Sequence, residues 1–235
     1  MSDKDRLPAK SRSADVDGFL RDLNRAPAVR SAGGRGRLIF ALDATASREP
    51  TWDRACRIQG EMFEATVGLG GLDVRLVFYR GFAECKASRW MRNAAELHKA
   101  MSSVSCIGGE TQIERVLEHA IGETKKQRVH ALVFVGDAME ESADRLCQLA
   151  GELGLLGTPV FIFHEGGDAT ADAVFRQIAK LSRGAYLSFD LASADKLKEL
   201  LAAVAVYAAG GYRALADFST KRGGDIRLLT AQLQG

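Results

Sequence analysis

Five short runs rich in apolar residues divide the chain, at residues 38–42, 74–79, 131–135, 159–163 and 185–189. Apolar runs of about five residues are typical of strands that are buried on both faces of a sheet. A polar run at residues 84–87 follows Gly81 and predicts a short strand that pairs with residues 74–79 as a hairpin at the sheet edge. The pattern therefore predicts six strands, one of them an antiparallel edge strand.

Between the predicted strands, apolar residues recur at helical spacing. The clearest stripe repeats at i, i+3, i+4, i+7 and i+8 and consists of Ile113, Val116, Leu117, Ala120 and Ile121. Similar stripes predict helices from about Pro50, across residues 146–153 and 174–181, and across residues 197–207, with the uncharged run 200–212 forming one helix face. Strands that alternate with helices predict an α/β, Rossmann-like, three-layer αβα fold with a mostly parallel central sheet.

The chain of 235 residues is long enough for one such domain with short ends. Residues 1–36 contain Pro8, Pro27 and a Gly-rich stretch, and they predict a flexible basic leader. A short amphipathic piece at residues 17–23 predicts a helix that either packs on the domain or docks a partner. We expect the domain to span residues 37–212 and a C-terminal tail to span residues 213–235.

Charge and cysteine usage exclude several classes of protein. The net charge is +2, and residues 1–37 carry nine Lys or Arg and five Asp, so the rest of the chain nets −2. The start is polar without an apolar signal segment, and no apolar run is long enough to span a bilayer. The four cysteines are far apart and form no CxxC pair, which argues against a zinc knuckle or a disulfide framework. We therefore expect a cytoplasmic protein.

Polar residues follow the predicted strands where ligands bind in open α/β sheets, at the carboxyl ends of the strands. Asp43-Ala-Thr-Ala-Ser47 follows the first strand, a Gly-rich segment ends at Thr111, and Asp137 follows the strand at 131–135. Two carboxylates and three hydroxyls suit Mg²⁺, which takes oxygen ligands and keeps several waters; Mn²⁺ fits the same set. The hydroxyls add no negative charge, so the ion stays electrophilic and a partner's Asp or Glu is the natural further ligand.

These residues resemble the motif of the von Willebrand factor A (VWA) domain family. Its metal-ion-dependent adhesion site (MIDAS) has the pattern DxSxS, then a Thr in a GGxT-like loop, then an Asp after the central strand. Here Thr45 stands where the family usually has Ser, and Gly136 and Ala138 flank Asp137 where the family more often has Thr or Ser before it and Gly after it. The resemblance covers residues 38–210.

The resemblance also implies ligand roles and a function. Thr45, Ser47 and Thr111 would be direct or near-direct ligands of the ion, and Asp43 and Asp137 would act through water. It implies a metal-dependent protein-binding adaptor or assembly domain, whose bacterial-type cytoplasmic relatives work beside partner ATPases or chelatases. We expect such an ATPase or chaperone-type partner to present an acidic side chain.

Structural explanations compete with this site. Asp43 could cap a turn, as the near-repeat Asp168-Ala-Thr-Ala-Asp172 is interpreted to cap a helix. Thr111 could cap the helix that follows it. His164 and Glu165 end a predicted strand and are interpreted as structural, and Cys106 as a small buried residue.

Two other functions stay open as alternatives. One is a metal-dependent hydrolase or phosphatase, because haloacid-dehalogenase-type phosphatases also place a nucleophilic Asp after the first strand. They need a second Asp two residues later, where this chain has Thr45, and other catalytic signatures are missing, so we expect no enzyme. The other is nucleic-acid association through the leader, which acids at five positions dilute.

Overall fold

The computed structural model describes residues 35–50, 52, 60–189 and 194–221. Most of the predicted leader, the short helix at residues 17–23 and residues 222–235 of the predicted tail lie outside this part of the chain. The domain boundaries therefore stay predictions.

The described strands form one six-stranded sheet with the order β3-β2-β1-β4-β5-β6. Its strands are β1 (Gly36–Asp43), β2 (Leu72–Arg80), β3 (Glu84–Ala87), β4 (Ala131–Gly136), β5 (Val160–Glu165) and β6 (Ala185–Phe189). All neighbours are parallel except β2 and β3, which form an antiparallel hairpin at one edge. Gly81 in the connecting turn has a φ of 58°, a conformation that glycine adopts without strain. The predicted mixed sheet and its edge strand are confirmed.

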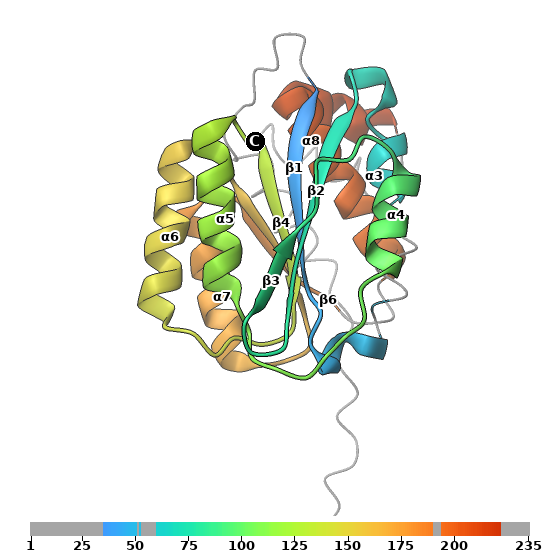
Figure 1. Cartoon of the computed structure of the whole chain (residues 1–235). Coiled ribbons are helices and arrows are strands. Elements are labelled where there is room, and N and C mark those ends of the chain that lie inside the picture. Colours follow the sequence, from blue (N-terminus) through green and yellow to red (C-terminus); the bar gives the residue numbers. More distant parts are fainter. Residues whose placement is uncertain (1–34, 51, 53–59, 190–193, 222–235) are drawn as a thin grey trace, which may run out of the picture.

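Helices cover both faces of the sheet (Figure 1). On one face lie α5 (Ile113–Lys126), α6 (Ala143–Leu156) and α7 (Ala169–Leu181), and on the other lie α3 (Gly60–Glu64), α4 (Ala94–Ser102) and α8 (Ala194–Lys221). Two short 3-10 helices, η1 (Ala46–Arg48) and η2 (Val67–Leu69), connect elements. Successive β1 residues point to opposite faces, so Phe40 packs into one hydrophobic core and Ile39 into the other. The three-layer αβα fold is confirmed.

Helix α4 was not predicted from the sequence. Only Leu97 and Met101 of its nine residues are buried, so it shows too short an apolar stripe to be recognised. The signal for its start is local: Asn93 is the N-cap and accepts a hydrogen bond from the backbone N–H of Glu96.

Helix α8 differs from the prediction in two ways. Residues 200–209 are buried all round rather than along one face, which matches their uniformly apolar composition. Beyond this run, helical structure continues to Lys221, where a loosely patterned tail was expected. A kink at Gly211, with φ 72° and ψ −168°, separates the two parts, so the glycine pair at 210–211 bends the helix instead of ending it. Among the described residues, no helix is long and apolar enough to cross a membrane.

The order of the strands in the sheet positions the loops that carry the candidate site. From β1 it moves outward to β2 and β3, then returns to the other side of β1 and adds β4, β5 and β6. The strand order therefore reverses between β1 and β4. At such a switch point the loops after the two strands diverge and leave a crevice at their carboxyl ends.

Candidate metal site at the strand ends

Asp43 and Asp137 lie at this switch point. Asp43 is the last residue of β1, and Asp137 directly follows β4. The two strands are parallel, with Leu42 opposite Val135, so both carboxylates lie at the same end of the sheet, where the strands have their carboxyl ends. The convergence predicted from the sequence is present in the structure.

Buried hydrogen bonds fix the orientation of the Asp43 carboxylate. Its side chain is 1% exposed. Oδ1 accepts a hydrogen bond from the backbone N–H of Thr45 at 2.7 Å, and Oδ2 accepts one from the hydroxyl of Tyr79 at 2.9 Å. Burial raises the pKa of Asp43, while these hydrogen bonds oppose the increase and the negative charge of Asp137 adds to it. A bound cation would relieve this burial penalty.

The hydroxyls of Thr45, the N-cap of η1, and Ser47, within η1, lie 3.1 Å apart. In an octahedral magnesium site with metal–oxygen distances of 2.0–2.1 Å, adjacent ligand oxygens are separated by about 2.9 Å. The two hydroxyls therefore already have the spacing of neighbouring ligands. Thr45 is buried and Ser47 is exposed, so this pair lies at the boundary with solvent.

We call the surface formed by the loops after β1, before α5 and after β4, at the carboxyl ends of the strands, the rim. Thr111 belongs to this rim, because its loop contacts the other two loops. Ile107, in its loop, donates its backbone N–H to the carbonyl of Ala44 at 3.1 Å. The Thr111 hydroxyl donates to Glu141 Oε2 at 2.5 Å and accepts from the backbone N–H of Glu140 at 2.9 Å. The loops after β1, before α5 and after β4 thus meet, with the Thr111 hydroxyl turned toward Glu141.

Glu141, which the sequence did not single out, caps helix α5. Its Oε1 accepts hydrogen bonds from the backbone N–H groups of Ile113 and Glu114. The structural N-cap, Gln112, makes no side-chain cap bond, so the interpretation of Thr111 as the helix cap is wrong. A carboxylate from another loop serves this helix N-terminus, where negative charge is stabilised.

The string Asp168-Ala-Thr-Ala-Asp172, which follows β5, caps a helix, as the sequence predicted. Asp168 is the N-cap of α7, and its Oδ1 accepts from the backbone N–H of Ala171 at 2.6 Å. The two similar strings therefore differ in context: one begins a helix, and the other ends β1 at the switch point.

Asp137 combines an anchored backbone with an unengaged side-chain oxygen. Its carbonyl lies 3.2 Å from Nε2 of the buried His164, whose Nδ1 lies 2.8 Å from the Tyr186 hydroxyl. That hydroxyl in turn donates to Asp172. Within the described part of the chain, Asp137 Oδ1 is buried and has no hydrogen-bond partner. A buried carboxylate oxygen without a donor is rare, and a cation would satisfy it.

Arg48 is a charged residue of the rim that the sequence pattern did not single out, although it directly follows Ser47. Its side chain is 5% exposed and forms an ion pair with Glu165 at the end of β5. Burial lowers the pKa of Arg48, and the negative charges of Asp137 and Asp43 are the main opposing influences. The rim therefore holds one guanidinium among three carboxylates, and these four side chains carry a formal charge of −2.

The donor set fits a small divalent cation. The hydroxyl spacing, the unengaged Asp137 oxygen and the excess of two negative charges all favour one. In the described residues, no group of three or more His, Cys, Asp and Glu side chains is placed to hold a metal ion, here or elsewhere, so this donor set depends on hydroxyl oxygens as well as carboxylates. Arg48 is the feature that a simple cation site does not need.

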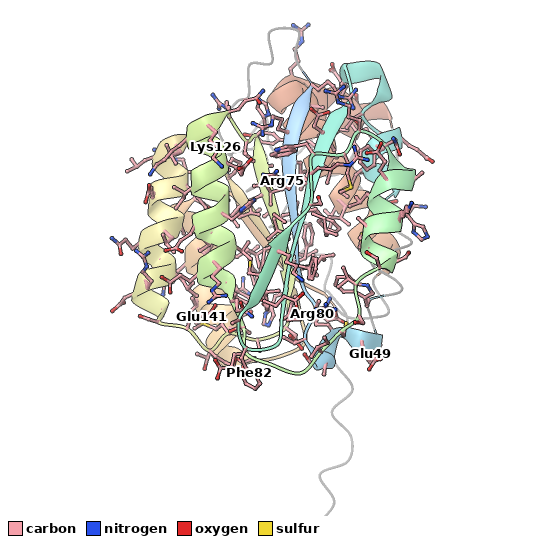
Figure 2. The ribbon with its side chains drawn as sticks, in the orientation of Figure 1. Glu49, Arg75, Arg80, Phe82, Lys126 and Glu141 are labelled. Atoms are coloured by element: carbon pink, nitrogen blue, oxygen red, sulfur yellow. The ribbon has the colours of Figure 1, made fainter. Side chains whose placement is uncertain are left out.

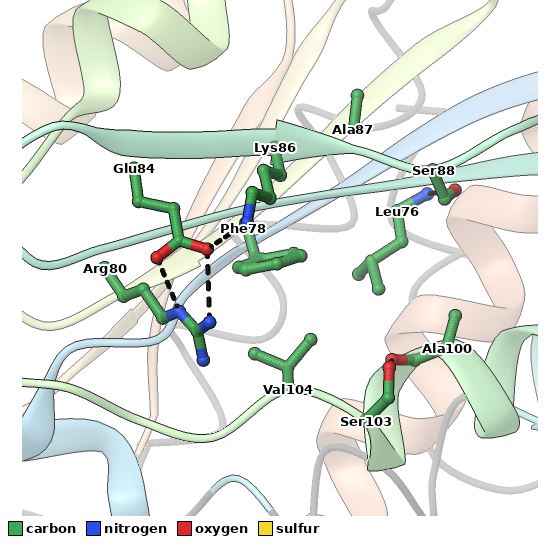
Figure 3. Close-up of a pocket in the computed structure, with 10 residues that line it drawn as sticks. All are labelled: Leu76, Phe78, Arg80, Glu84, Lys86, Ala87, Ser88, Ala100, Ser103 and Val104. Carbon is green, nitrogen blue, oxygen red and sulfur yellow. Dashed lines mark hydrogen bonds and ion pairs between the residues drawn. The ribbon is translucent and has the colours of Figure 1, made fainter.

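A groove lies at the edge of the sheet, between β3 and the segment after α4 (Figure 3). This groove of about 320 Å³ has an apolar floor that includes Phe78. Glu84 in its wall accepts two hydrogen bonds from Arg80 and pairs with Lys86 at 2.7 Å. Its three charged side chains carry a formal charge of +1, so this groove does not suit a cation.

No protein-family profile matches the chain, and no curated protein sequence is significantly similar to it. Solved structures do match. A von Willebrand factor type A protein from Catenulispora acidiphila superposes with a TM-score of 0.59 over 72% of this chain, at 16% identity. The SpRpn10 VWA domain superposes with a TM-score of 0.55 over 75% of this chain and 97% of its own length, at 13% identity. The chain has the VWA fold.

A third VWA-like structure shows that the fold can carry a metal at this motif. Proximal thread matrix protein 1 from the mussel byssus, solved with a zinc-occupied MIDAS motif, matches with a TM-score of 0.59 and 17% identity over 76% of this chain. This chain spans 42% of the Catenulispora protein and 47% of the mussel protein. At these identities the likeness concerns the VWA fold, and the metal ligands of this chain stay predictions.

Proposed function

We propose that the protein is a metal-dependent protein-binding domain. A divalent cation, Mg²⁺ or Mn²⁺, would be held by Thr45, Ser47 and Thr111 with Asp43 and Asp137 behind them, and it would supply an electrophilic position for a partner's Asp or Glu. The observation that carries the proposal is the buried, unengaged Asp137 Oδ1, which lies at the same sheet edge as the buried Asp43 carboxylate.

The protein side of the site is already organised. Tyr79 and the Thr45 backbone hold Asp43, and His164 holds the Asp137 backbone. Since the supporting contacts exist before a cation arrives, little ordering is needed on binding, which favours affinity.

Binding rather than catalysis is favoured by the position of Asp43. A phosphatase nucleophile must reach its substrate, but this carboxylate is 1% exposed and both of its oxygens accept hydrogen bonds. We propose that the domain works in the cytoplasm as an adaptor or assembly factor beside an ATPase or chaperone-type partner.

The first test is calorimetric titration of Mg²⁺ and Mn²⁺ into the chelator-stripped protein. We expect saturable binding that both Asp43→Ala and Asp137→Ala lose while staying folded. Asp168→Ala is the matched control, because it alters the similar string at the α7 cap. It should cost about 1 kcal/mol of stability but keep the metal. Metal binding retained by both rim variants would disprove the site.

Binding of a carboxylate to the metal can be measured separately from binding of the metal to the protein. With Mn²⁺ bound, acetate should displace a metal-bound water and lower the water-proton relaxation enhancement, in a saturable way. Methylammonium chloride at equal ionic strength is the control. An unchanged relaxation enhancement with acetate would separate metal binding from carboxylate recognition and contradict the second.

A further inference from the structure

The ion pair between Arg48 and Glu165 spans the candidate site. Arg48 lies in η1, directly after β1, while Glu165 is the last residue of β5. Strands β1 and β5 are separated by β4, so the ion pair joins strand ends about 10 Å apart. The end of β4 lies between them, and Asp137 directly follows it. The Arg48 side chain therefore crosses the rim where the cation would bind.

Electrostatics agree with this placement. The guanidinium is buried and pairs with Glu165, and the negative charges of Asp137 and Asp43 oppose the decrease of its pKa that burial causes. A buried charge is tolerated only when opposite charges compensate it. Arg48 thus receives compensation from the same carboxylates that a divalent cation would use.

We propose that Arg48 is the resident cation of the rim: it holds the three carboxylates together in the metal-free protein and competes with the divalent ion for them. This inference rests on the proposed metal-dependent function. It implies that metal affinity is set by Arg48 as well as by the ligands, and that metal binding weakens the hold of Asp43 and Asp137 on the guanidinium.

The test is a Mn²⁺ titration of wild type, Arg48→Met and Arg48→Gln, with thermal melts in chelator and in Mn²⁺. Both variants remove the charge and keep most of the side-chain volume, and Gln can still bond Glu165 if Met prevents folding. Removing a positive charge next to a divalent ion should tighten Mn²⁺ binding by about tenfold or more. In chelator both variants should melt below wild type, because three carboxylates then lack their cation, and Mn²⁺ should recover most of the loss.

Arg37→Met is the matched control, since Arg37 is also a buried arginine of the β1 region that pairs with a glutamate, Glu123, at the opposite end of the strand. It should lower the melting temperature without changing Mn²⁺ affinity, and Mn²⁺ should not recover its loss selectively.

The outcomes separate the two proposals. If wild type binds Mn²⁺ and both folded Arg48 variants bind it equally or more weakly, the role of Arg48 is disproved and the metal site stands. If only the Arg48 variants bind, Arg48 is the resident cation and the native protein is no metal-dependent binder. If none binds, both proposals fall.

Discussion

Charged side chains gather at both ends of β1, in opposite proportions. Near its first residues one buried carboxylate, Glu123, pairs with three cations: Arg37, Arg75 and Lys126. At its last residue and beyond it, one buried guanidinium, Arg48, lies among three carboxylates: Asp43, Asp137 and Glu165. Figure 2 shows Arg75 and Lys126 toward one end of the molecule, and Glu49 and Glu141 at the other.

The two regions also differ in how completely their carboxylates are satisfied. Trp90 donates its ring N–H to Glu123, and the Arg37 guanidinium lies 4.0 Å from the centre of the Trp90 ring, so the Glu123 carboxylate is surrounded by donors. Within the described residues, the buried atom that lacks a hydrogen-bond partner in this cluster is a donor, Nε of Arg75, whereas at the other end it is a carboxylate oxygen, Oδ1 of Asp137. A fully paired carboxylate stabilises the fold, whereas a carboxylate with an unengaged buried oxygen is suited to bind a cation.

The largest expected loss of stability is at the Glu123 end. Glu123→Gln leaves the buried Arg37 and the partly buried Arg75 side chains without their carboxylate, and an uncompensated buried charge is strongly destabilising. We expect a loss of about 3 kcal/mol in the free energy of unfolding, measured in urea. Mn²⁺ affinity should not change. A loss below about 1 kcal/mol would mean that solvent screens this cluster as it screens surface pairs.

The pKa of Glu123 determines how the stability difference between wild type and Glu123→Gln depends on pH. Burial alone would raise this pKa, but Lys126, Arg75 and Trp90 outweigh burial and hold it below its ordinary value of 4.5. A depressed carboxyl pKa contributes stability above 4.5 that is lost as the pH falls through the folded-state pKa. The gap between wild type and Glu123→Gln should therefore be full at about pH 7 and shrink below about pH 4. A stability difference that does not change with pH would mean that lost packing, and not the lost charge, destabilises the variant.

At the other end, Tyr79→Phe removes the hydroxyl that donates to Asp43 Oδ2 in the core. An unsatisfied buried carboxylate oxygen should cost about 1 to 2 kcal/mol in chelator. Mn²⁺ affinity should fall about tenfold, because Asp43 loses an orienting contact. If stability falls and affinity is unchanged, Tyr79 supports the fold alone.

Sequence reasoning located the rim but not its electrostatics. The positions of Asp43 and Asp137 follow from strand ends, because parallel strands bring their carboxyl ends to one edge. The short apolar runs and the helical stripes predicted the layers, because burial on a sheet or helix imposes a recognisable pattern of apolar residues.

The missed features depend on side-chain direction and on tertiary context. Whether Arg48 turns outward or across the rim depends on the geometry of η1 and on Glu165, which is distant in the sequence. Glu141 reaches α5 from another loop, so no local spacing reveals it as a cap. At Gly211 the helix kinks and resumes, although a glycine pair predicts an end.

The smallest expected change in metal-free stability is that of Asp43→Asn. This variant gives the sharpest contrast with Glu123→Gln, because each substitution replaces one buried carboxylate by its amide. Burial raises the pKa of Asp43, so folding already works against its charge, whereas folding favours the charge of Glu123. In the Asp43→Asn variant the side-chain carbonyl can still accept the Thr45 N–H bond, and the side-chain amide group can donate to the Tyr79 oxygen.

We therefore expect a change in metal-free stability below about 1 kcal/mol at neutral pH, of either sign, for Asp43→Asn. The same variant should lose most of its Mn²⁺ affinity in the titration. A metal-free loss as large as that of Glu123→Gln would contradict the comparison, because it would place Asp43 among the residues that stabilise the fold. A small loss of stability with a large loss of metal affinity would separate a carboxylate kept for binding from one kept for folding.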